Sequence, residues 1–122
     1  MARMTRARFN TFCRTLPGAH HVVQWGGSDV WKVGPKVFAI GGWDRGAYPA
    51  VTFKVTGLGW QLLNAAPGCR PAPYLASRGL QWIQVYAEPG LRLSDLKRCI
   101  TESHAMVVST LPAKLRAVLR VS

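Results

Sequence analysis

The chain has 122 residues, of which 48% are hydrophobic, so it is long enough for one domain whose core needs no disulfide or metal to fold. Lysine and arginine number 16 against 5 aspartate and glutamate residues, which gives a net charge of +11. No hydrophobic run is long enough to span a bilayer, and the basic start lacks the apolar stretch of a secretory signal. We therefore expect a single cytoplasmic domain over residues 1–122 that makes no membrane contact.

The charge imbalance indicates the class of partner. A basic surface concentrates polyanions around itself, and nucleic acid is the commonest of these. An acidic protein would be attracted by the same field, and a basic surface can also serve solubility without a specific partner. Nucleic acid is the partner that we expect, DNA ahead of RNA, with these alternatives open.

The first predicted element is an amphipathic helix that ends at a proline-glycine pair. Its apolar face has the i, i+3, i+4 and i+7 spacing, with four members: Phe9, Phe12, Cys13 and Leu16. The rest of the segment carries arginines with no acidic residue between them: Arg3, Arg6, Arg8 and Arg14.

Two β-rich runs, residues 30–33 and 36–40, surround a glycine-proline turn and predict a hairpin. The expected register places Trp31 opposite Phe38. This register divides the side chains between a core face and an outer face. The core face takes Trp31, Val33, Phe38 and Ile40. Lys32 then points to the outer face, and Lys36 lies near the hairpin tip.

A glycine-rich loop over residues 41–46 follows the hairpin and contains Trp43 and Arg45. It can act as a wing tip, but it does not match a phosphate-binding loop because no Gly-Lys-Ser/Thr follows. The next strand, residues 50–55, alternates cleanly, so its valines and phenylalanine point inward while Thr52 and Lys54 point outward.

The remaining elements complete an α+β pattern. Thr56 is placed to cap a short helix, and the prolines of residues 65–75 predict an ordered loop. A strand over residues 80–86 precedes the longest helix, which Ser94 would cap, and Pro112 stops this helix or starts a short last one. The order helix, three strands, helix, strand, helix, helix predicts an antiparallel sheet of about four to five strands with helices packed on one face.

Several stretches, in this order, match a known pattern over nearly the whole chain. They are residues 12–18 (FCRTLPG), 30–39 (VWKVGPKVFA), 51–55 (VTFKV), 70–75 (RPAPYL) followed by Trp82-Ile83, 93–96 (LSDL) and 103–112. The ordered set resembles the MmcQ/YjbR family.

This resemblance implies a fold similar to that of bacterial frataxin. It also implies a DNA-binding role, which the family carries by likeness to a double-wing DNA-binding domain, although a fold alone does not fix a function. It supplies no catalytic residues. Iron binding by frataxin-like folds would need clustered oxygen ligands on the first helix, and this helix carries arginines instead.

The sheet supplies the first group of candidate nucleic-acid-binding residues. Lys32 and Lys54 are expected on the same outer face, with Lys36 nearby. On the last strand, Trp82 alternates with Ile83, so one of these two side chains faces outward. If it is Trp82, the face combines ammonium groups with a flat ring, which suits single-stranded nucleic acid. The alternative is that Trp82 fills core space.

The loops supply the second group. Arg70 begins the proline-rich loop and Arg78 follows it, so the prolines would hold an arginine ready for a phosphate or carboxylate. The alternative is a structural lid in which Arg70 bonds backbone carbonyls. Trp43 and Arg45 of the glycine-rich loop complete the candidates.

Catalysis, metal and cofactors are not expected. The five acids are scattered, which makes a paired-carboxylate mechanism hard to build. The three histidines fit no zinc spacing with the three cysteines, which themselves show no disulfide or CxxC pattern. We therefore expect a monomeric, non-catalytic nucleic-acid-binding module. A protein adaptor for an acidic partner and a small-molecule-binding domain are the alternatives.

Overall fold

The computed structural model describes residues 3–42, 49–73, 75 and 79–121. The elements in chain order are α1 (Arg6–Arg14), β1 (Ala19–Gln24), β2 (Ser28–Val33), β3 (Lys36–Gly41), β4 (Val51–Lys54), α2 (Gly57–Leu63), β5 (Cys69–Pro71), β6 (Trp82–Val85), α3 (Leu93–Ser109) and α4 (Ala113–Leu119). The α+β class is confirmed.

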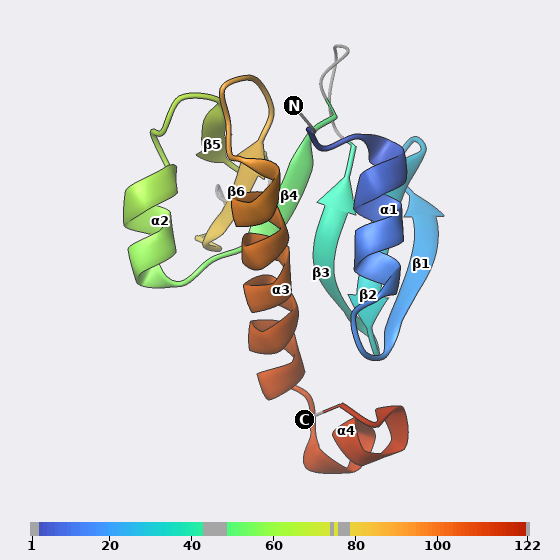
Figure 1. Ribbon diagram of the computed structural model, residues 1–122. Helices are drawn as coiled ribbons and strands as arrows, with labels where there is room; N and C mark the ends of the chain where they lie inside the picture. The colour runs from blue at the N-terminus through green and yellow to red at the C-terminus, as the bar shows by residue number, and fades with distance from the viewer. Residues whose placement is uncertain (1–2, 43–48, 74, 76–78, 122) are drawn as a thin grey trace.

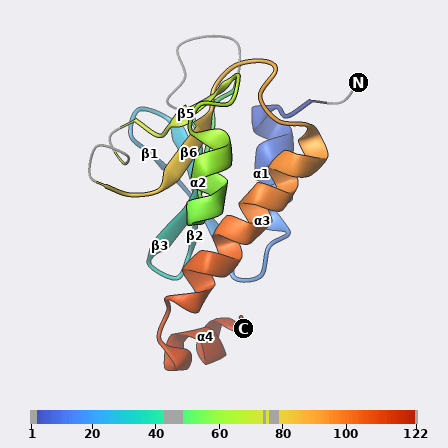
Figure 2. The ribbon, with the colours of Figure 1, turned by 90° about the vertical axis from the view of Figure 1, so that its left-hand side faces the viewer.

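The strands form one antiparallel sheet in the order β1-β2-β3-β4-β6-β5. Helices α1 and α3 lie against one face of it, α2 flanks β6, and α4 closes the end near the β2–β3 turn (Figures 1 and 2). Among the described residues, no helix lies on the opposite face (Figure 2). The helices are therefore on one side, as expected.

Two strands were not predicted. The first, β1, pairs with β2 along its whole length, although its partly exposed side chains show no clean alternation. The second, β5, has three residues and occupies a segment that its prolines predicted as a loop. Pro71 fits there because an edge strand does not need every backbone N–H for pairing. The sheet has six strands rather than four or five.

A β-bulge corrects the predicted hairpin register. Trp31 pairs with Ala39 instead of Phe38, while Val33 still pairs with Lys36, so Phe38 is the extra residue. The bulge leaves Phe38 on the helix side. There its ring packs edge-on against the ring of His104 of α3, with 5.0 Å between the ring centroids.

The bulge also moves Ile40 off the predicted core face. Ile40 pairs with Val30 and Thr52 and projects away from the helices. Trp31 stays on the helix side, where its indole N–H donates to Asn10 of α1 at 2.9 Å.

The core forms between the sheet and the helices. The residues predicted to be buried there are all at most 1% exposed: Trp31, Val33, Phe38, Val51 and Phe53. From α1, Phe9 and Cys13 are fully buried, and the ring of Phe9 lies where a Cβ on Gly41 would clash with it. Close approach of the helix to the sheet thus depends on glycine at position 41.

The helix caps are partly as predicted. Thr56 accepts from the Gly59 amide at the start of α2, as expected. Helix α3 begins at Leu93 with Arg92 in the cap position and no side-chain cap, so Ser94 lies inside the helix rather than capping it. Pro112 starts the last helix.

Candidate nucleic-acid interface

The helix-free face of the sheet carries cationic and aromatic side chains in a row. In β2, Lys32 pairs with His20 on one side and Val37 on the other. Two strands away, Lys54 of β4 pairs with Trp82 of β6. Paired residues of neighbouring strands project to the same face, so Trp82 lies beside the ammonium group of Lys54.

A second row, one step along the strands, links these residues to Arg70. Its members pair successively across the whole sheet: Val22, Val30, Ile40, Thr52, Gln84 and Arg70. Since Lys32 is two residues from Val30 and Lys54 is two residues from Thr52, both rows share one face. We call His20, Lys32, Lys54, Arg70 and Trp82 the basic sheet face. None of its members has an acidic partner among the described residues.

Trp82 is only half-buried, whereas Ile83 and Val85 on the helix side are fully buried. The structure therefore places Trp82 on the outer face, the first of the two arrangements considered above. Tyr86, which follows β6, is 37% exposed.

Arg70 is held by two contacts. Its Nε donates to Gln84 Oε1 at 2.8 Å, and its guanidinium lies 4.3 Å from the ring centroid of Tyr86. Among the described residues, Arg70 is thus anchored by a side-chain amide and a ring. Tyr86 was considered with Trp82 as part of an aromatic set on the last strand, whereas Gln84 was not predicted as a site residue. The alternation of Trp82, Gln84 and Tyr86 was the available signal.

A buried polar pair lies beneath this surface. Thr52 and Gln84 are directly paired across β4 and β6, and both are 0% exposed. Thr52 Oγ1 and Gln84 Nε2 have no hydrogen-bond partner among the described residues. Because unpaired buried polar atoms cost free energy, a water or a ligand atom at this point would stabilise the sheet centre.

Of the other predicted site residues, the structure describes only Lys36, which does not join this face. Lys36 lies on the helix side, where its ammonium group donates to Thr110 Oγ1 at 2.9 Å at the C-terminal end of α3. Trp43, Arg45 and Arg78 lie outside the described residues.

The acids with described ion pairs are on the helix side. Asp29 Oδ2 accepts a hydrogen bond from Arg6 Nε at 2.8 Å, and Asp29 Oδ1 lies 2.7 Å from His21 Nε2. These two contacts connect α1 to the β1–β2 hairpin. Burial raises the pKa of Asp29, but hydrogen bonds from His21, Arg6 and Asn10 outweigh it and leave the pKa below its ordinary value.

Two further ion pairs are exposed, namely Arg3 with Glu88 and Arg98 with Asp95. No group of three or more potential metal ligands occurs in the described part of the chain. None of its helices is long and apolar enough to cross a bilayer.

The thiols are shielded from ionisation. Burial raises the pKa of Cys13 and of Cys69, and it raises that of Cys99 to about 11. All three are therefore protonated at neutral pH, which disfavours a thiolate nucleophile.

The order of the elements and their motifs can be compared with known proteins. A family model described as YjbR matches residues 14–106. The chain belongs to the YjbR family. The resemblance drawn from the motifs is thereby confirmed, and no curated protein matches the chain.

Solved structures support the same YjbR fold. A crystal structure of the Deinococcus radiodurans protein DR2400, with a DUF419 domain, has a TM-score of 0.82 at 17% identity and covers 97% of this chain and 89% of its own. A Pseudomonas syringae protein has a TM-score of 0.65 at 18% identity, covering 82% of this chain and 96% of its own. At such identities the likeness shows the fold alone.

Proposed function

We propose that this YjbR domain binds nucleic acid through the basic sheet face, with a preference for single-stranded segments and without catalysing a reaction. The observation that carries the proposal is the direct pairing of Lys54 with Trp82 on a face without a helix among the described residues. An ammonium group beside a half-exposed ring matches a phosphate with its adjoining base.

The spacing on this face suits an extended strand. Neighbouring strands of a sheet lie about 4.8 Å apart, so the backbones at Lys32 and Lys54 are roughly 10 Å apart. Two such cations can contact different phosphates of one chain, with Trp82 stacking on a base beyond them. Arg70, fixed by Gln84 and Tyr86, extends the cationic surface to the edge strand β5.

Phosphate contacts of this kind carry no base information, so the sequence preference is weak. Affinity falls with salt because counterions are released from the polyanion. The +11 net charge adds long-range attraction to the same ligand. DNA is proposed ahead of RNA because the resemblance to the family implies a DNA-binding role.

Fluorescence anisotropy tests the proposal with labelled single-stranded DNA, duplex DNA, single-stranded RNA and heparin across a salt series. We expect single-stranded DNA to bind most tightly, with a linear fall of log affinity against log salt. Binding of heparin as tight as that of every nucleic acid would reject it. The charge would then serve a general polyanion or an acidic protein partner.

A further inference from the structure

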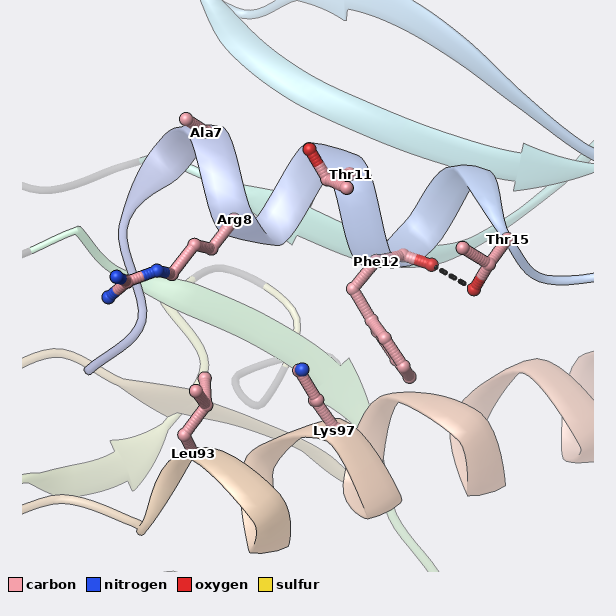
Figure 3. Close-up of a pocket in the computed structure, with 7 residues that line it drawn as sticks. All are labelled: Ala7, Arg8, Thr11, Phe12, Thr15, Leu93 and Lys97. Carbon is pink, nitrogen blue, oxygen red and sulfur yellow. Dashed lines mark hydrogen bonds between the residues drawn. The ribbon is translucent and has the colours of Figure 1, made fainter. Parts of the chain in front are cut away.

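A groove separates α1 from α3 on the opposite side of the sheet from the proposed interface. Its volume is about 390 Å³, within the range of small-ligand sites. Figure 3 shows Lys97 pointing from α3 toward α1, the ring of Phe12 between the helices, and Arg8 at the end of the groove beside the start of α1. Leu93 closes the side that belongs to α3.

The two cations of the groove lack acidic partners among the described residues. Arg8 donates to the backbone carbonyl of Arg3 at 2.6 Å, and the ammonium group of Lys97 lies 5.5 Å from the ring centroid of Phe12. Neither contact neutralises the charge.

Two acids of this region are already engaged in ion pairs, and Glu102, five residues after Lys97, does not line the groove. Asp95, two residues before Lys97, is bound by Arg98, and Glu88 is bound by Arg3. No acidic residue lines the groove as described. The groove therefore presents two uncompensated positive charges, one of them on the half-buried side chain of Lys97.

A half-buried ammonium group without a counter-ion is partly desolvated, so an anion beside it gains more than it would in open water. A bare inorganic anion would satisfy the charges but leave the apolar walls, Phe12 and Leu93, in contact with water. An anion with an apolar body covers both kinds of surface.

We propose that the α1–α3 groove binds a small organic acid, with its carboxylate between Arg8 and Lys97 and its aromatic or aliphatic body against Phe12 and Leu93. The site is independent of the proposed nucleic-acid interface because none of its residues belongs to the basic sheet face. Its ligand class is a monocarboxylate with an aromatic or aliphatic body, because the carboxylate matches the two cations and the apolar part matches Phe12 and Leu93.

Isothermal titration calorimetry with 2-naphthoate tests the site, with 2-naphthylmethanol as the neutral analogue and inorganic phosphate as the bare anion. We expect naphthoate to bind and each of Lys97→Met and Arg8→Gln to weaken it about fivefold, as one partly exposed ion pair is lost. Lys97→Met keeps the apolar stem beside Phe12. Lys114→Met on α4, an equal loss of charge far from the groove, should change the affinity less than about twofold.

Chemical-shift mapping on the wild-type protein keeps the test independent of any variant that fails to fold. The amides that shift with naphthoate should lie in residues 7–15 and 93–97. Equal binding of the alcohol or of phosphate would overturn the proposal. So would an absence of binding at millimolar naphthoate, equal weakening in Lys114→Met, or shifts elsewhere in the chain.

Discussion

Lys54 lies directly opposite Trp82 across the β4–β6 pairing, and both project from the face on which no described helix lies. The pairing is fixed by the backbone ladder, so the two side chains remain neighbours whatever rotamers they adopt. This geometry distinguishes the role of the charge from the role of the ring, and each can be removed separately.

Removal of the charge should weaken binding of all nucleic acids alike. Lys54→Ala should flatten the slope of log affinity against log salt by about one unit on duplex DNA and by about 0.7 on single strands, since one phosphate contact is lost. Lys32→Ala should do the same. Anisotropy at several salt concentrations measures the slopes, and Lys114→Ala is the control of equal charge. A slope unchanged in Lys54→Ala would place the ligand elsewhere.

Removal of the ring should act on single strands in particular. Trp82→Ala should weaken the binding of single-stranded DNA about tenfold or more, because stacking is lost, and should change the affinity for duplex DNA much less. Trp82→Phe should have a smaller effect in the same direction. Trp60→Phe on α2 is a matched change away from the face. If the melting temperature falls while affinity per folded molecule is unchanged, Trp82 is a packing residue only.

Gly68 tests the close contact between the loops that flank β5 and β6. Its φ is +81°, and a Cβ there would overlap the carbonyl oxygen of Ala87 and the amide nitrogen of Gly90. Gly68→Ala should lower the free energy of unfolding by about 3 kcal/mol or more, because neither backbone can move freely.

Gly57→Ala is the matched control for Gly68. Nothing lies within 4 Å of its added Cβ, and the residue opens α2. The change should be neutral or should stabilise by up to about 1 kcal/mol through helix propensity. Urea unfolding of both variants makes the comparison. Equal effects at the two positions would contradict the predicted clash.

Asp29 should make the stability depend on pH in the acid range. Its pKa is depressed in the folded state, so its contribution is present above the unfolded value of about 4 and is lost as pH falls through the folded value. Asp29→Asn should lower stability at pH 7 by about 1–2 kcal/mol and reduce the fall below about pH 4. Urea midpoints measured from neutral pH down into the acid range follow both effects. If the loss of stability below about pH 4 were the same in Asp29→Asn as in the wild type, that loss would be caused by other carboxylates.

The buried faces of the sheet could be predicted because alternation tolerates one irregularity. Trp31, Val33 and Phe53 are buried as their spacing indicates, even though the Phe38 bulge shifts the pairing by a residue. The position of the bulge could not be predicted, because local alternation does not reveal an extra residue; in the fold, Phe38 packs against His104 of α3, far along the chain. Short, proline-containing β5 gave no strand pattern of its own.

The candidate site could likewise be predicted only in part. Alternation alone puts Lys32 and Lys54 on one face, and it offered Trp82 as one of two arrangements. It also indicates the helix side for Lys36, which pairs with Val33, but it cannot predict the contact with Thr110, 74 residues later, that holds the side chain there. It also could not pair Arg70 with Gln84, since that contact follows from the unrecognised β5–β6 ladder.

The hydroxyl of Ser103 joins α3 to the two central strands at the end of their ladder. It donates to the Phe38 carbonyl at 2.7 Å and accepts from the Lys54 amide at 2.9 Å. A helix side chain thus bridges two backbone groups at the point where the strands no longer hydrogen-bond to each other directly. The backbone that carries Lys54 is thus fastened through the sheet to the helix layer. Hydrogen exchange at the Lys54 amide therefore reports the undocking of α3 rather than strand separation, and it gives a single-proton readout of how firmly the two layers are joined.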